Sequence, residues 1–192
     1  EADKASGMLY TEGFVRHWDS WMDGRRSQLM IAALDEDGTL GEPRLLSKGI
    51  NGDIPSKPFG DASEYAFSPD GSTIYFSVRN LSAGEPWSTN FDIYAVPSDG
   101  SAEPKNLTAS NPAWDAYPLP SRDGKTLYYL AMARPGMESD RFAIKAMHLD
   151  TGETREVAGD WDRSAGPLKE SVDVKTLYTT TDDNGQHPLF AI

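Results

Sequence analysis

Short apolar runs alternate with polar turn signals along the chain. Residues 65–67 read Tyr-Ala-Phe, residues 69–71 read Pro-Asp-Gly, and residues 74–76 read Ile-Tyr-Phe. Proline presets φ for the first turn position, whereas Asp-Gly supplies a side-chain hydrogen bond and a residue that accepts positive φ. Because aromatic and β-branched residues on both sides favour strands, the pattern predicts a β-hairpin.

The same pattern recurs with a period of about fifty residues. Its turn aspartates are Asp70, Asp123 and Asp173, which are 53 and 50 residues apart. The first two copies each continue into a third strand, a second turn and a short fourth strand, within residues 91–107 and 142–157. Four antiparallel strands repeated at this spacing are typical of a β-propeller blade.

We therefore predict an all-β fold, a partial β-propeller of four-stranded antiparallel blades with about three and a half blades in the chain. The expected units are a partial blade at 1–48, whole blades at 60–108 and 112–158, and a partial blade at 164–192. Within the first unit, a second strand is expected to end at 8–10, with later strands at 28–34 and 43–46. Residues 15–22 are expected to form a turn or two of helix.

Composition and charge exclude several classes of function. The formal net charge of −12 repels phosphate backbones, so nucleic acid is not an expected partner. The absence of cysteine excludes disulfides, thiolate zinc sites and cysteine nucleophiles. No apolar run is long enough to cross a bilayer. The compartment stays open between cytoplasm and bacterial periplasm, and the start at Glu1 suggests an internal or processed piece of a longer protein.

Three segments carry a resemblance to a known family. Residues 16–21 read Arg-His-Trp-Asp-Ser-Trp, residues 67–71 read Phe-Ser-Pro-Asp-Gly, and residues 86–92 read Pro-Trp-Ser-Thr-Asn-Phe-Asp. They resemble the propeller of bacterial serine peptidases related to prolyl oligopeptidase, in the acylaminoacyl-peptidase and dipeptidyl-peptidase branch. The resemblance implies that a seven- or eight-bladed propeller caps an α/β-hydrolase domain, which carries the Ser–Asp–His triad.

The hydrolase signature itself is absent from this sequence. No G-x-S-x-G pentapeptide occurs, so the family's catalytic residues match no positions here. The resemblance thus implies a substrate-gating propeller segment without catalytic residues or cofactors, whose partners are peptide substrates and the parent's hydrolase domain. A TolB-like, non-catalytic propeller that acts as a periplasmic protein-interaction module is the alternative. We also hypothesise that two copies pair through their open blade edges.

Four residues are candidates for substrate binding. His17, between two tryptophans, is either a buried hydrogen-bonded histidine or a substrate-channel contact. Glu85 and Glu138 lie in long loops between strands, where substrate contacts tend to occur. Trp87, in the same loop as Glu85, is the tryptophan expected to be exposed, whereas the others are expected to pack between blades.

The resemblance also implies a role for carboxylates, because aminopeptidase branches of the family bind the free amine of a substrate with carboxylates of the propeller. Glu12, Glu64, Glu85 and Glu138 are the candidates for this role, and none of them matches that motif. His148 and His187 are expected to be structural. The acidic runs at 35–38 and 182–185 lack the ligand spacing of a calcium loop and are expected to be hairpin turns, so no metal site is predicted.

Overall fold

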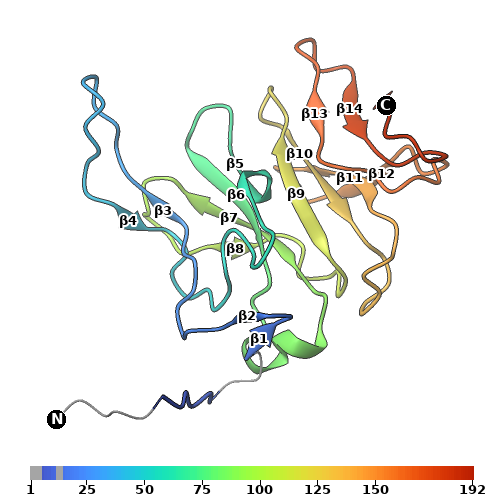
Figure 1. Cartoon of the computed structure of the whole chain (residues 1–192). Coiled ribbons are helices and arrows are strands. Elements are labelled where there is room, and N and C mark those ends of the chain that lie inside the picture. Colours follow the sequence, from blue (N-terminus) through green and yellow to red (C-terminus); the bar gives the residue numbers. More distant parts are fainter. Residues whose placement is uncertain (1–5, 12–14) are drawn as a thin grey trace.

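Five antiparallel sheets make up the computed structural model, which describes residues 6–11 and 15–192 (Figure 1). The described residues contain two short 3-10 helices, η1 (Ala62–Glu64) and η2 (Ser82–Trp87), and no α-helix. The all-β fold class is therefore confirmed.

The two central sheets each have four strands joined in chain order, as expected for whole blades. The first contains β5 (Tyr65–Phe67), β6 (Thr73–Val78), β7 (Asp92–Pro97) and β8 (Lys105–Asn106). The second contains β9 (Asp115–Pro120), β10 (Thr126–Ala131), β11 (Ala143–His148) and β12 (Thr154–Val157). Every neighbouring pair within these sheets is antiparallel.

Smaller sheets lie on either side of the central pair. A two-stranded sheet precedes them, with β3 (Met30–Ile31) and β4 (Arg44–Leu45). A three-stranded sheet follows them, with β13 (Lys169–Glu170), β14 (Leu177–Thr180) and β15 (Leu189–Ala191). Only two residues of the expected strand at 28–34 belong to β3, and residues 8–10 form no strand.

The expected helix at residues 15–22 is wrong. This segment forms a separate hairpin of β1 (Arg16–His17) and β2 (Ser20–Trp21), closed by a bond from Met22 N to Val15 O of 3.0 Å. Trp18 occupies the turn with φ of 50°, a left-handed conformation that no helical pattern would indicate. The hairpin replaces the helix because its two-residue turn reverses the chain before a helical turn can form.

The repeated turns use one hydrogen-bonding pattern. Ser68 Oγ donates to Asp70 Oδ1 at 2.6 Å, and the amide of Thr73 donates to Ser68 Oγ at 2.9 Å. The same serine–aspartate pairs occur in the next two copies, at Ser121–Asp123 and Ser171–Asp173. The bond from Ser68, together with bonds from the Ser72 amide and hydroxyl, lowers the pKa of Asp70 to about 2, so the carboxylate stays charged and keeps the turn closed.

The core lies between successive sheets. Side chains of β6 alternate between its two faces. Phe76 packs with Leu46, which follows β4, whereas Tyr75 packs on the opposite side with Leu127 of β10. A third cluster joins Leu130 to the last sheet. Because both faces of a blade are covered by neighbours, five of the six β6 residues are buried. This stacking of sheets side by side is the packing of a propeller.

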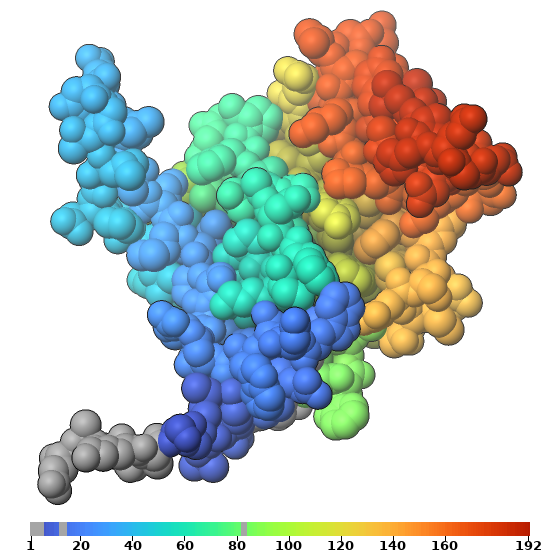
Figure 2. Space-filling view, in the orientation of Figure 1, coloured from blue at the N-terminus to red at the C-terminus, as the bar shows by residue number. Residues whose placement is uncertain are grey.

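Long connections gather at one end of the sheets, here called the loop face. There the β6–β7 and β10–β11 connections contact the segment that links the two central sheets. Asp115 N donates to Phe91 O of the β6–β7 connection, and Met132 N, just after β10, donates to Trp114 O of the linking segment, both at 2.8 Å. The β1–β2 hairpin and η2 lie at this end in Figure 1. In Figure 2 the blue N-terminal residues lie across it, next to the green loop. The short serine–aspartate turns close the other end of each blade.

Candidate functional site

A cavity of about 310 Å³ opens on the loop face. Three segments of the chain line it: residues 17–25 from the hairpin onward, residues 53–58 before the first whole blade, and residues 79–91 around η2. These segments are far apart in sequence, so their arrangement depends on the polar contacts that join them.

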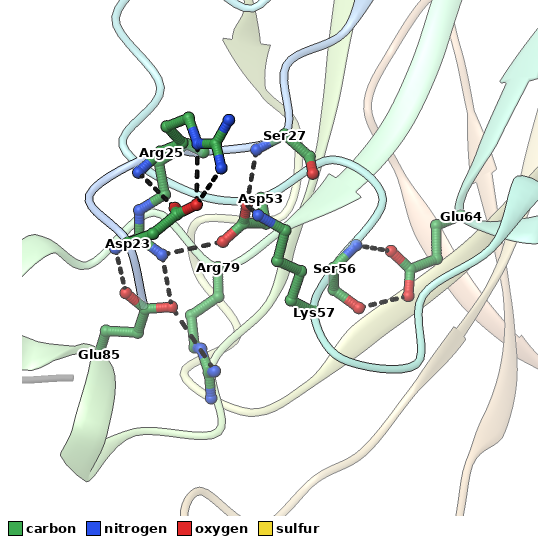
Figure 3. A network of polar contacts seen from close by, with 10 residues as sticks. Asp23, Arg25, Ser27, Asp53, Ser56, Lys57, Glu64, Arg79 and Glu85 are labelled. Carbon is green, nitrogen blue, oxygen red and sulfur yellow. Dashed lines mark hydrogen bonds and ion pairs between the residues drawn. The ribbon is translucent and has the colours of Figure 1, made fainter. Parts of the chain in front are cut away.

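Arg26, which lines an adjoining cavity together with Asp23 and Glu85, joins the three segments. Figure 3 shows the carboxylates of Asp53 and Glu85 in this network, with Arg79 beside Glu85. Arg26 Nη1 donates to Asp53 Oδ2 at 3.0 Å, and its Nη2 donates to Glu85 Oε2 at 2.6 Å. Only 5% of the Asp53 side chain and 7% of the Glu85 side chain are exposed. Two buried carboxylates on one guanidinium form charge-assisted bonds of high geometric specificity, so the network fixes the segments relative to one another.

Further contacts extend the network to both sides. Asp53 also accepts from the amide of Ser27 at 2.6 Å and pairs with Lys57 Nζ at 3.0 Å. Arg79 Nη2 lies 3.6 Å from Glu85 Oε1, and its guanidinium carbon lies 5.1 Å from the centroid of the Phe91 ring. Burial lowers the pKa of Arg79, while the nearby carboxylates, Glu85 foremost, oppose that shift.

Glu64, on η1, binds the segment of residues 53–58 on the side away from the cavity. Its carboxylate accepts from Ser56 N and from Ser56 Oγ, both at 2.6 Å. Burial raises the pKa of Glu64, and the two bonds to Ser56 partly offset that effect. Both oxygens of Glu64 thus bind the protein's own loop, which gives this residue a structural role in the cavity wall.

Exposed aromatic rings form the outer part of the site. The Trp18 ring lies 5.2 Å from that of Phe59 and 5.1 Å from that of His17, measured between centroids. Trp21 lines the cavity with 64% of its surface exposed. Trp18 and Trp21 were expected to pack between blades, but they belong to the separate hairpin, which has no blade to pack against. Trp87 is 87% exposed, as expected.

The structure brings two of the four candidate residues together. His17 and Glu85 line the same cavity. Trp87, on η2, is not among the residues that line it. Glu138 lines another cavity of about 520 Å³, with Arg134 among its neighbours. Substrate binding by all four stays a prediction, and Glu12 lies outside the described residues.

Sequence reasoning missed the residues that build the network. Arg26, Asp53, Lys57 and Arg79 match no short motif, and they lie in three separate segments. The available signal was weak: charged residues between predicted strands, next to the segment that carried the family resemblance. Their pairing depends on the fold and cannot be deduced from local spacing.

Another buried carboxylate lies farther along the loop face, at the start of β9. Asp115 is 1% exposed and lines a cavity of about 400 Å³. Burial raises its pKa to about 7, and the bond that Asn111 Nδ2 donates at 2.8 Å only partly opposes this. Asp92 adds to the shift by like-charge repulsion.

The two other histidines and the acidic runs lie outside the cavities described above. His187 pairs with Asp182 at 2.9 Å on the surface, and His148 is an exposed end of β11. In the part of the chain that the structure describes, no cluster of three or more His, Asp or Glu residues is placed to hold a metal ion. Over the same part, none of the helices has the length and apolar character needed to cross a membrane.

Sequence comparison identifies relatives over the whole chain. No protein-family model matches it. Dipeptidyl-peptidase 5 of Arthroderma otae is 31% identical over 207 residues, covering 100% of this chain and 28% of the relative. Probable dipeptidyl-peptidase 5 of Trichophyton verrucosum is 32% identical over 202 residues, covering 98% of this chain and 28% of the relative. The chain therefore spans little more than a quarter of the length of these proteins.

Solved structures share the fold. Puromycin hydrolase matches with a TM-score of 0.60 and 18% identity, over 86% of this chain and 26% of that protein. Its S511A mutant complexed with PGG gives a TM-score of 0.61 at 17% identity. Together with the stacked four-stranded sheets, these similarities confirm the resemblance to the propeller of peptidases related to prolyl oligopeptidase: this chain is a β-propeller segment that is similar over its whole length to part of the dipeptidyl-peptidases 5 and shares its fold with puromycin hydrolase.

Proposed function

We propose that the chain forms part of a propeller that controls the access of peptides to a hydrolase domain elsewhere in its parent protein. The observation that carries this proposal is similarity along the whole chain to about a quarter of several dipeptidyl-peptidases 5. The absence of a nucleophile elbow from this sequence supports a division of labour, in which another domain performs the hydrolysis.

The cavity on the loop face supplies a physical basis for selection by size. Its walls are joined by buried ion pairs, which hold the three segments in fixed positions. A volume of about 310 Å³ is at the lower end of the range for small-molecule sites. An extended peptide can insert one or two side chains into a cavity of this size, whereas a folded protein cannot, so steric exclusion would select unfolded or short substrates.

The proposal divides the candidate residues into two roles. His17, Trp21 and Phe91 present ring surfaces to the cavity and would contact substrate directly. Glu85 binds Arg26 through both oxygens, at 3.3 and 2.6 Å. In this proposal it acts as a positioning residue, which keeps η2 against the hairpin. Trp87 and Glu138 stay predictions of substrate contact on neighbouring parts of the loop face.

Trp21 provides the test, because it lines the cavity and is exposed enough to be truncated without loss of the fold. In the full-length parent protein, kcat/KM would be measured for a chromogenic dipeptide and for a long unstructured peptide. We expect Trp21→Ala to raise the ratio of long-peptide to dipeptide kcat/KM severalfold by widening the entrance. Val172→Ala, 85% exposed in the β13–β14 turn, is the control and should leave the ratio unchanged. An unaltered ratio in Trp21→Ala would contradict a gating role for this cavity.

A further inference from the structure

The charges around the cavity on the loop face differ from those of the chain as a whole. The chain carries a net charge of −12. The network in and behind the cavity wall contains the cations Arg25, Arg26, Lys57 and Arg79 and the carboxylates of Asp23, Asp53 and Glu85. With the carboxylate of Glu64, which binds Ser56 in the same wall, this local group has as many positive as negative charges, before any contribution from His17.

Each carboxylate in this group is already bound to other groups of the chain. Asp23 accepts from Arg25 Nε at 2.8 Å, and Asp53 binds Arg26 and Lys57. Glu85 binds Arg26 through both oxygens. A ligand amine would have to displace one of these bonds and would bring a positive charge with no carboxylate left to pair with it, so the site is poorly suited to an ammonium group.

The cations retain access to the cavity. Arg79 and Lys57 both line it, with 15% and 45% of their side chains exposed. An arginine presents several donors in a fixed planar fork that matches a carboxylate. Burial lowers the pKa of Arg79, which means that the surroundings do not fully compensate its charge. An incoming anion would supply part of that compensation.

We propose that this cavity binds a carboxylate group of a peptide between the Arg79 guanidinium and the Lys57 ammonium, with the neighbouring peptide side chain against Trp21 and Phe91. The proposal rests on the proposed function only for the choice of a peptide as ligand. It identifies the class of substrate that the propeller selects: peptides with an acidic side chain or a free carboxyl terminus at the position that reaches this cavity.

Four small probes distinguish the sources of the charge. Acetyl-Phe-Glu-amide carries only a side-chain carboxylate, and acetyl-Phe-Gln carries only a terminal one. Acetyl-Phe-Gln-amide is neutral, and Phe-Gln-amide carries only an amine. Binding to the protein would be measured by calorimetry at neutral pH. We expect one of the two carboxylate probes to bind at least about tenfold more tightly than the neutral probe, with the difference falling as salt is raised.

Variants locate the site of binding. Lys57→Gln should reduce the preference for the carboxylate probe severalfold, and Lys57→Arg should restore it, because the charge returns. Lys105→Gln removes the same charge from an exposed position on β8 and serves as the matched control. Arg79→Lys, which keeps the charge but loses the planar fork, should weaken binding of the carboxylate probe more than binding of the neutral probe.

Equal binding of all four probes, or tighter binding of the amine probe, would overturn the proposal. So would an equal loss of preference in Lys57→Gln and Lys105→Gln, because the effect would then come from total charge. These binding results do not depend on hydrolysis. A carboxylate preference would therefore stand even if Trp21→Ala failed to alter the selection by length in the parent protein, and the two proposals can fail separately.

Discussion

Arg26 shows how one residue determines the geometry of the site. Its guanidinium is 17% exposed and touches carboxylates from two different segments of the chain. The neighbouring residue Arg25 has a side chain that is 86% exposed and pairs only with nearby Asp23. Two adjacent arginines therefore differ in burial and in partners: Arg26 binds residues far away in the sequence, whereas Arg25 binds a residue close to it in the sequence.

Replacing Arg26 should destabilise the protein far more than replacing Arg25. Arg26→Met leaves two buried carboxylates short of their main partner, and losing one side of a buried ion pair costs about 3 kcal/mol or more. Arg25→Ala removes an exposed pair, which should leave stability nearly unchanged. Urea unfolding, followed by tryptophan fluorescence, gives both free energies. Similar values for the two variants would contradict the importance assigned to the buried network.

Asp115 predicts a pH dependence of stability. Its folded pKa of about 7 lies above the ordinary value of 3.8, because the carboxyl group is buried. Between these values the folded state retains the proton and the unfolded state does not, so the stabilising contribution is complete below about pH 4 and is lost as pH rises to about 7.

Asp115→Asn should therefore be more stable than the wild type at pH 8, by up to about 4 kcal/mol, with the difference closing toward pH 4. The amide keeps the shape of the side chain and the acceptor for Asn111. Urea midpoints at a series of pH values, compared between the two proteins, provide the measurement. A difference that stays constant with pH would show that Asp115 titrates normally in the folded state.

At the scale of elements, the repeated turns explain why the blades were predictable. Each serine–aspartate turn is local, so its sequence pattern determines the hairpin around it. The third copy keeps this turn although Val174 stands where the others have glycine, and Val174 accepts φ of 54°. The β1–β2 hairpin has no glycine in its turn, so residues 15–22 carry no comparable turn signal, and their pattern is also compatible with a turn of helix.

The site was less predictable than the blades because its contacts are not local. His17 and Glu85 were identified through the family resemblance and through loop position. Arg26 pairs with Glu85 across 59 residues of sequence and with Asp53 across 27. Such ion pairs form only after the sheets have stacked, and no periodicity in the sequence predicts them.

Gly52 tests how closely the loop before the first whole blade approaches β6. A Cβ at this position would lie 2.4 Å from Arg79 O and 2.6 Å from Val78 Cγ2. Gly52→Ala should thus displace the loop that carries Asp53 and lower the thermal midpoint by several degrees, equivalent to about 1–3 kcal/mol. Gly84→Ala meets nothing nearer than 3.8 Å and should be tolerated. Equal melting of both variants would contradict the close approach.

At the scale of the whole molecule, the first and last sheets have fewer strands than the central blades. The sheet of β3 and β4 has two strands, and the sheet of β13 to β15 has three. Leu189 on β15 is 67% exposed. Strand edges of this kind accept further strands. We propose that additional blades of the parent protein, or a second copy of this chain, cover them.

Light scattering distinguishes these occupants. A second copy at the edges should give a dimeric mass that rises with concentration, and Leu189→Lys should return it to the monomer by placing a charge on the edge strand. A monomeric mass at high concentration would contradict pairing between copies and leave the edges to further blades.

The central claim is that this chain guides peptides and leaves their hydrolysis to another domain. The most direct measurement treats the repurified chain and its full-length parent with a serine-directed phosphonate, and assays both for peptide hydrolysis. We expect the parent to be labelled and active, and this chain to show neither labelling nor turnover. Labelling of a serine within these 192 residues, with hydrolysis that survives repurification, would contradict the account.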